Sequence, residues 1–265
     1  MKTILLATLA MLTVVGTSTA KSPKTQTNVI AHRGYWKTSG SHENSIASIK
    51  KAVEHKMYGA EFDVWLTADN VPVVYHNSKT ANGILIQNTT LADLRAKADK
   101  LPNGEVIPTL DEYLTAWNHG STKLICEIKR HRDDQRNRDI VHEIIKVMNA
   151  HNVGADEAQY ITFGRTSIEE LLKADVPQEI IYLNGDMTPQ ELKDWGVDGF
   201  DYSYKVLDQH PEWIQEAREL GLSSNVWTID DPALMQKYID LGVDYITTDD
   251  PILLLELLKK SKKKK

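Results

Sequence analysis

The sequence is poor in cysteine. Cys126 is the only one among 265 residues, so the chain can form no internal disulfide bond. Cys126 lies in an apolar stretch, where a thiol is more often a small core side chain than a nucleophile. We therefore expect a fold held together by one large apolar core, which a chain of this length with 41% hydrophobic residues can bury.

The sequence has no hydrophobic run long enough to cross a bilayer core of about 30 Å. Its longest apolar run, from Ile4 to Val15, follows the positive residue Lys2 and precedes the small residues Ser18-Thr19-Ala20. This arrangement is typical of a secretory signal peptide. We expect residues 1–20 to be a signal peptide cleaved after Ala20, and the mature protein to be periplasmic or secreted.

An excess of positive charge is also missing. The formal net charge is −6, and six of the basic residues are confined to the lysine-rich tail, 259–265. Between residue 20 and this tail, 24 basic residues face 37 acidic ones, which argues against a nucleic-acid partner. The tail could contact an anionic membrane surface weakly, although a solvated, frayed chain end explains it as well.

What the sequence does contain is a regular alternation of short β-rich runs and helical repeats. The runs are 29–31, 61–66, 124–129, 160–163, 180–183, 199–202, 225–227 and 245–248. Helical repeats such as Ile140, Ile144 and Met148 lie between them. Thr188-Pro189, Asp231-Pro232 and Asp250-Pro251 favour helix starts, whereas Gly196, Gly221 and Gly242 favour helix ends.

Eight alternating units predict an α/β fold, a (β/α)8 TIM barrel spanning residues 21–258. An open, doubly wound sheet is the alternative, because a count of strands does not prove that the sheet closes.

One additional strand breaks the alternation. The run from Val71 to Tyr75 follows Leu66 after only four residues, too few for a crossover, so the two runs should form an antiparallel hairpin. If Leu66 faces Val71, His76 lies opposite Glu61, and a bulge would shift this pairing by one residue. Residues 77–108 then form a small insertion after the hairpin, which we expect to cover the functional site.

Ionisable residues gather where the first three barrel strands end. His32 and Arg33 follow the first strand, and strand alternation places Glu61 and Asp63 on one face of the second. Glu127 and Lys129 share a face of the third.

Three buried carboxylates that point together require a counter-charge, and oxygen ligands favour Ca²⁺ or Mg²⁺. Arg33 and Lys129 could bind phosphate oxygens, and His32 and His76 could transfer protons near neutral pH. Simpler interpretations exist for each residue alone: Glu127 and Lys129 could pair with each other, and His32 could be a buried structural imidazole.

These residues belong to a longer pattern of motifs. The pattern comprises His32-Arg33-Gly34, His42-Glu43-Asn44-Ser45, Glu61-Phe62-Asp63-Val64, Val71 to His76, Pro108 to Glu112, Glu127-Ile128-Lys129, Val226-Trp227-Thr228 and Thr248 to Pro251. In this order and spacing, the chain resembles the glycerophosphodiester phosphodiesterase family from about Asn28 to Leu258.

The resemblance implies a metal-dependent hydrolase that converts a small glycerophosphodiester into an alcohol and glycerol 3-phosphate. It implies His32 and His76 as the acid/base pair, and Glu61, Asp63 and Glu127 as ligands of a divalent metal. It further implies phosphate contacts from Arg33 and Lys129, an apolar wall from Trp227, and support of the site by Glu43 from behind.

The chain departs from the family pattern at three positions, since His42 replaces a proline, Ser45 a threonine and Asn77 an aspartate. The arginine–threonine–threonine run that many members carry in the insertion is also missing. These departures leave the residues expected to carry the chemistry in place, but they leave the identity of the substrate open. A lysophospholipase D or sphingomyelinase D activity, a phosphatidylinositol phospholipase C relative, and an inactive binder of phosphorylated envelope glycans remain as alternatives.

Overall fold

The computed structural model of the protein describes residues 26–262. The expected signal peptide, residues 1–20, lies outside the described residues, as do the last three lysines. The final helix, α10 (Pro251–Lys262), continues past the expected domain boundary at 258. The lysine-rich tail therefore begins as the last turns of a helix, and not as a separate extended segment.

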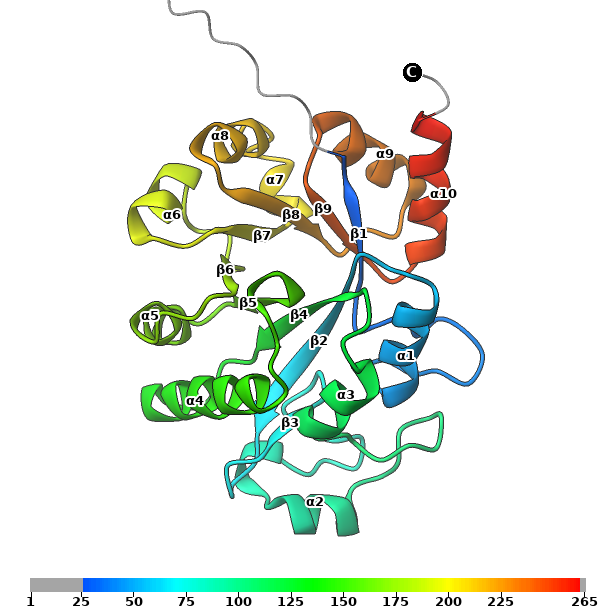
Figure 1. The fold of residues 1–265 in the computed structure, drawn as a ribbon, viewed down its shortest axis with the longest axis vertical. Helices are drawn as coiled ribbons and strands as arrows, with labels where there is room; N and C mark the ends of the chain where they lie inside the picture. Colours follow the sequence, from blue (N-terminus) through cyan, green and yellow to red (C-terminus); the bar gives the residue numbers. More distant parts are fainter. Residues whose placement is uncertain (1–25, 263–265) are drawn as a thin grey trace, which may run out of the picture.

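Eight parallel strands close into a barrel at the centre of the molecule (Figure 1). They are β1 (Asn28–Ala31), β2 (Gly59–Leu66), β4 (Lys123–Ile128), β5 (Ala158–Thr162), β6 (Glu179–Tyr182), β7 (Gly199–Ser203), β8 (Ser223–Trp227) and β9 (Tyr245–Thr248). Strand β1 pairs with β9 on one side and with β2 on the other, which completes the ring. The predicted TIM barrel is confirmed, and the open sheet is excluded.

Helices cover the outside of the barrel (Figure 1). Besides α10 they are α1 (Ile46–Glu54), α3 (Leu110–Trp117), α4 (Asp134–Ala150), α5 (Arg165–Lys173), α6 (Pro189–Trp195), α7 (Tyr204–Leu207), α8 (Trp213–Leu220) and α9 (Pro232–Leu241), with a short 3₁₀ turn, η2, at Ala155–Glu157. Within residues 26–262, none of the helices has the length and apolar character needed to cross a membrane.

The predicted helix boundaries are confirmed where the sequence signals were strongest. Thr188 and Asp231 cap α6 and α9 with their side-chain oxygens, each directly before a proline in the first turn. Gly196, Gly221 and Gly242 end α6, α8 and α9 with positive φ, a conformation that glycine adopts without strain.

Strand alternation divides the apolar side chains into two layers. Outward-facing residues such as Phe62, Cys126 and Phe200 pack beneath the helices in the main core. Inward-facing isoleucines, among them Ile30 and Ile125, fill the barrel interior. Cys126 is a fully buried core residue, as predicted.

The hairpin strand β3 (Pro72–Val74) pairs antiparallel with β2, as predicted, but the expected register was wrong by one residue. Leu66 faces Pro72 rather than Val71, because the Thr67 N–H donates to the Val71 carbonyl and extends the turn. The last ladder bond joins the Tyr75 N–H to the Asp63 carbonyl (2.9 Å). His76 follows directly, beyond the end of the ladder, and is free to turn into the barrel mouth.

The insertion contains η1 (Ile86–Asn88) and α2 (Leu91–Lys97), the latter where a short helical piece was predicted. It builds a second small core around Trp65, Val73, Ile86 and Leu94, beside the β2–β3 hairpin (Figure 1). None of residues 77–108 is among those lining the cavity at the barrel mouth, so the lining of the cavity does not support the expectation that the insertion covers the site. Its apolar side chains are used against the hairpin instead.

Candidate active site

A cavity of about 180 Å³ lies at the carboxyl ends of the barrel strands. Strand ends at this rim of a TIM barrel converge, which brings together residues far apart in the sequence. The cavity is lined by His32, Arg33, Glu61, His76, Glu127, Lys129, Ile161, Phe163, Leu183, Asp201, Trp227, Thr228 and Thr247. Seven of the eight predicted site residues are among them, and the eighth, Asp63, lies against this group.

The three predicted carboxylates form one cluster. Glu61 and Asp63 point inward from β2, and Glu127 lies beside Asp63 because β2 and β4 pair in that register. Each carboxylate contributes one oxygen atom to a group of three, and these three oxygen atoms lie within 4.8 Å of one another. Glu61 and Asp63 are only 2% and 1% exposed, so water screens their repulsion poorly.

The electrostatics of the cluster reflect this crowding. Burial and the neighbouring charges of Asp63 and Glu127 raise the pKa of Glu61 well above its ordinary value. Burial and Asp63 raise the pKa of Glu127 to about 7. Burial also acts to raise the pKa of Asp63, but Lys129 and His76 outweigh it and lower that pKa. The cluster therefore carries more negative charge than its protein surroundings stabilise.

The cluster fits a hard divalent cation. The Oε1 atom of Glu61 is buried, and no described residue donates a hydrogen bond to it. Three carboxylates on rigid strands, with close ligand atoms and an unsatisfied oxygen, are the donor set that Ca²⁺ and Mg²⁺ accept. Glu61, Asp63 and Glu127 would hold such an ion.

Lys129 lies between two of these acids. Its Nζ is 2.5 Å from Oδ1 of Asp63 and 2.7 Å from Oε1 of Glu127, so the simpler pairing of Glu127 with Lys129 is present. One ammonium does not neutralise three carboxylates, however, and Glu61 forms no ion pair with it. The pairing accounts for the position of Lys129 but does not remove the need for further positive charge.

His32 follows β1 and is held on one side by Asp249. Its Nδ1 lies 2.7 Å from Oδ1 of Asp249. The same oxygen accepts a hydrogen bond from the Trp36 indole, and the other oxygen of Asp249, Oδ2, lies 3.6 Å from the Lys37 ammonium. Its Nε2 lies 4.0 Å from Oε2 of Glu61. Because a carboxylate oxygen accepts hydrogen bonds, Nδ1 carries a proton and Nε2 faces the cavity.

His76 also lines the cavity, and the charge of Asp63 acts on its imidazole. Its Nδ1 lies 3.1 Å from Oδ1 of Asn77, the residue directly after it. Burial lowers the pKa of His76, and although the charge of Asp63 opposes this effect, Lys129 and Arg33 reinforce it. The two predicted histidines thus line one cavity, one fixed by a carboxylate and the other by an amide.

Arg33 is held by a tight turn after β1. Its backbone N–H donates to Oε2 of Glu61 (2.8 Å), and its guanidinium donates to Glu43 (2.5 Å). Arg33 has a φ of 56°, and Gly34, which follows it at 78°, lies so close to Ser48 that a Cβ there would collide. Glu43 therefore supports Arg33 from behind, as predicted, and the guanidinium remains on the cavity wall.

The far wall of the cavity is apolar. Trp227 and Phe163 meet edge to face, with ring centroids 5.8 Å apart, and Leu183 and Ile161 continue this wall. The Trp227 indole N–H donates to the Asp201 carbonyl (2.9 Å), which fixes the ring. Trp227 is thus part of the apolar side of this cavity.

Three functional residues received no role from the sequence. Asn44 donates to Oδ2 of Asp63 (2.7 Å) and accepts from the Asp63 N–H; Asp249 holds His32; and Asp201 lines the cavity. Asn44 and Asp249 stood within the motifs, but only the fold shows their partners. Asp201 lies two residues after Gly199 on an inward face, so alternation along β7 could have identified it.

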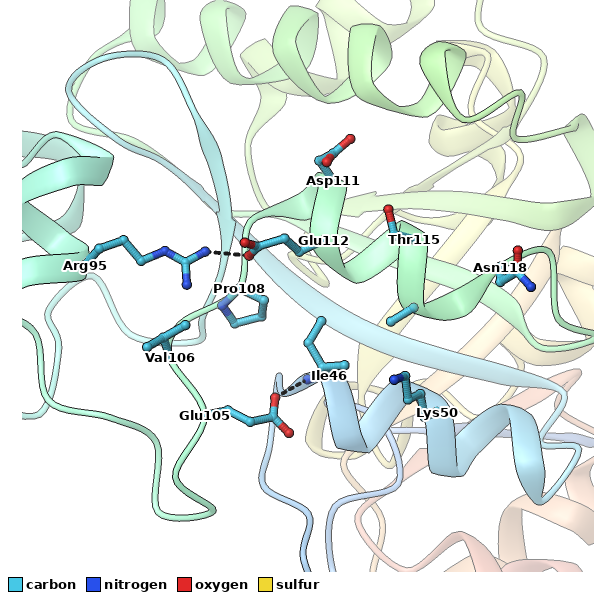
Figure 2. Close-up of a pocket in the computed structure, with 11 residues that line it drawn as sticks. Ile46, Lys50, Arg95, Glu105, Val106, Pro108, Asp111, Glu112, Thr115 and Asn118 are labelled. Carbon is cyan, nitrogen blue, oxygen red and sulfur yellow. Dashed lines mark hydrogen bonds and ion pairs between the residues drawn. The ribbon is translucent and has the colours of Figure 1, made fainter.

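A larger hollow of about 790 Å³ lies on the outer surface between α1, α3 and residues 105–108 (Figure 2). Some of its charged side chains have partners nearby. Arg95 pairs with Glu112 (2.5 Å), and Glu105 accepts hydrogen bonds from the Ile46 and Ala47 N–H groups at the start of α1. No histidine is among its lining residues, so the chemistry points to the cavity at the barrel mouth.

Comparisons with known proteins point the same way. A sequence profile of the glycerophosphoryl diester phosphodiesterase family matches residues 32–253. A glycerophosphodiester phosphodiesterase from Caldanaerobacter subterraneus subsp. tengcongensis is 28% identical over 246 residues, which cover 89% of this chain and 99% of that protein.

Two solved structures share the fold. The crystal structure of a glycerophosphodiester phosphodiesterase from Parabacteroides distasonis has a TM-score of 0.86 and 44% sequence identity, covering 91% of this chain and 100% of that one. A phosphodiesterase from Oleispira antarctica, in complex with the product sn-glycerol-3-phosphate, has a TM-score of 0.73. The two sequences are 21% identical, and the match covers 88% of this chain and 96% of the other chain. At this identity the likeness shows the fold alone.

The raised pKa values predict how the stability of the metal-free protein depends on pH. An unfolded glutamate titrates near 4.5, whereas Glu127 titrates at about 7 in the folded protein, and Glu61 is shifted in the same direction. Between these values the folded state keeps protons that the unfolded state releases, so these two glutamates lower the stability as the pH rises from 5 to 8. The lowered pKa values of His131 and His76 act in the opposite direction in the lower part of this range. We therefore expect the fall in melting temperature to be clearest between about pH 6.5 and 8, measured by calorimetry in EDTA.

The variant Glu127→Gln is the matched control, because a neutral amide of the same shape has no proton to lose. Its melting temperature should depend less on pH than that of the wild type, and added Ca²⁺ or Mg²⁺ should stabilise the wild type more at pH 8 than at pH 5. If the melting temperatures of the two proteins depended on pH in the same way, Glu127 would not be a source of the pH dependence, and the assignment of its raised pKa would be contradicted.

Proposed function

Since this chain belongs to the glycerophosphoryl diester phosphodiesterase family and is a phosphoric diester hydrolase, we propose that it hydrolyses small glycerophosphodiesters to an alcohol and glycerol 3-phosphate. The observation that carries the proposal is the shared cavity of two histidines, three clustered carboxylates and two cationic side chains.

Arg33 and Lys129 bind the phosphodiester in this proposal. Both side chains line the cavity, and both are already oriented by acids: Arg33 by Glu43, and Lys129 by Asp63 and Glu127. Groups held in place before the substrate arrives lose little freedom on binding, and they stabilise charge that develops on the phosphoryl oxygens. Ca²⁺ or Mg²⁺, when bound by Glu61, Asp63 and Glu127, would polarise the phosphoryl group.

The two histidines divide the proton transfers. Asp249 keeps a proton on Nδ1 of His32, which leaves the lone pair of Nε2 to accept the proton of the attacking oxygen. His76 gives a proton to the oxygen of the leaving alcohol. The attacking oxygen comes from water or from a neighbouring substrate hydroxyl.

The size of the cavity favours a small substrate over a lipid. A lysophospholipase D or sphingomyelinase D must accommodate an acyl or sphingoid chain beside the phosphodiester, and about 180 Å³ is below the range of about 300–1,000 Å³ common for ligand pockets. A binder of envelope glycans would have no use for paired histidines. We therefore favour a soluble glycerophosphodiester.

Replacing either histidine tests the proposed roles. We expect His32→Ala and His76→Ala each to lower kcat by about 10²–10⁴-fold, the range typical of lost acid/base catalysis, in an assay of glycerol 3-phosphate release. The control is His142→Ala, since His142 pairs with Glu170 on the outside of the barrel. Full activity in either cavity variant, or an equal loss in the control, would refute the assignment.

Removing the metal tests the role of the carboxylate cluster separately. Dialysis against EDTA should lower the rate at least about 100-fold, and Ca²⁺ or Mg²⁺ should restore it. The variant Glu61→Gln should require more metal for half-maximal activity. An enzyme that keeps its full rate after chelation, verified by elemental analysis, would exclude the metal.

We also propose that the apolar run at residues 4–15 directs export to the periplasm or the medium. The run follows a lysine and precedes small residues, as in secretory signals. Mass spectrometry of the protein from its native cells should find Lys21 as the first residue in the extracytoplasmic fraction. A chain that retains residues 1–20 in the cytoplasm would contradict export.

A further inference from the structure

Asp201 has no function in the mechanism above, yet it is an unusual residue. It lies on β7, it is 2% exposed, and it lines the active-site cavity. No residue in the described part of the chain donates a hydrogen bond to its Oδ1 atom, which is fully buried. A buried, unsatisfied carboxylate is costly, so one that faces a ligand cavity suggests a partner supplied by the ligand.

The charges around Asp201 increase this cost. Burial, and then the like charge of Glu127, raise the pKa of Asp201 well above its ordinary value. The two cationic side chains of the cavity are engaged elsewhere, since Arg33 pairs with Glu43, and Lys129 with Asp63 and Glu127. Asp201 therefore lacks a protein counter-charge within the described chain.

Two aromatic side chains, Trp227 and Phe163, line the same cavity as Asp201. Trp227 is fixed by its hydrogen bond to the Asp201 carbonyl, and Phe163 meets Trp227 edge to face. Aromatic faces attract organic cations, and a carboxylate beside them adds a charged hydrogen-bond acceptor. This combination recognises an ammonium group.

We propose that Asp201 is a specificity-determining residue that binds the primary ammonium group of the substrate's alcohol portion, with Trp227 and Phe163 packing around its short carbon chain. The inference rests on the proposed function and names its substrate class, the zwitterionic glycerophosphodiesters of a small amino alcohol. A primary ammonium carries the N–H donors that the unsatisfied Oδ1 lacks, whereas a quaternary ammonium has none.

The charge balance of the whole site agrees with this class. Because Arg33 is paired with Glu43, a divalent cation together with Lys129 offsets only three of the four charges of Glu61, Asp63, Glu127 and Asp201. A phosphodiester then adds one negative charge, and an ammonium on the same substrate cancels it. A small amino alcohol also suits a cavity of about 180 Å³.

The test compares two substrates that differ in one group. These are sn-glycero-3-phosphoethanolamine and its isostere, in which a hydroxyl replaces the ammonium. For the wild-type holoenzyme we expect kcat/KM to be at least about 10-fold higher for the ammonium substrate, as a charge-assisted hydrogen bond predicts. A preference ratio near one, or in favour of the hydroxyl substrate, would overturn the inference without any variant.

The variant Asp201→Asn tests the residue itself. An amide of the same shape keeps the packing but removes the charge, so the preference ratio should fall towards one. Asp198→Asn is the matched control, because Asp198 directly precedes the same strand at the opposite rim, where it accepts from the Ile180 N–H. Its ratio should remain that of the wild type.

The outcomes separate this inference from the proposed function. Hydrolysis of both substrates with a ratio that Asp201→Asn leaves intact would overturn the role of Asp201 alone. A wild-type enzyme that hydrolyses neither would overturn the proposed function, and this inference with it. Should Asp201→Asn fail to fold, as judged by circular dichroism, a wild-type ratio near one still overturns the inference, and Asp201→Glu, which keeps the charge but moves it, replaces the amide variant.

Discussion

Repulsion among buried carboxylates is the constraint on which the site depends. Asp63 and Glu127 lie side by side because β2 and β4 pair in that register, and Glu61 stands two residues earlier on the same inward face. The barrel buries Glu61 and Asp63 where water screens their charges poorly. Lys129, the Arg33 N–H and the Asn44 amide supply positive charge and hydrogen-bond donors to the cluster. The remaining deficit is one that a divalent cation, as proposed, would offset.

This constraint also explains the strained backbone nearby. Arg33 and Asn44 both have a φ of 56°, a conformation that residues other than glycine seldom adopt, and each donates a hydrogen bond to one of the acids. Gly34, pressed against Ser48, completes the turn that aims the Arg33 N–H at Glu61. Backbone strain at these positions is offset by hydrogen bonds to carboxylates that would otherwise lack donors.

Much of this site follows from local periodicity, and the part that does not depends on tertiary contacts. Alternation along a strand predicts that Glu61 and Asp63 share a face, because that rule needs only neighbouring residues. It does not predict that Asn44 reaches Asp63, or that Asp249, 217 residues away, holds His32, because the barrel must close first. The hairpin register was wrong by one residue for a related reason: a backbone hydrogen bond from Thr67 to Val71 decides it, and the sequence carries no sign of that bond.

The barrel divides the two tasks of the site between its strands. The residues assigned to phosphate, metal and proton transfer come from β2 and β4 and from the segments that directly follow β1, β3, β4 and β9. The wall facing them comes from β5 to β8 and contributes Phe163, Leu183, Asp201 and Trp227. Each strand of the barrel forms hydrogen bonds only with the strands next to it. A substitution in the wall from β5 to β8 can therefore change which alcohol fits without moving the carboxylates on β2 and β4. The reaction and the choice of substrate are thus separable in this fold, and Asp201 lies on the side that chooses.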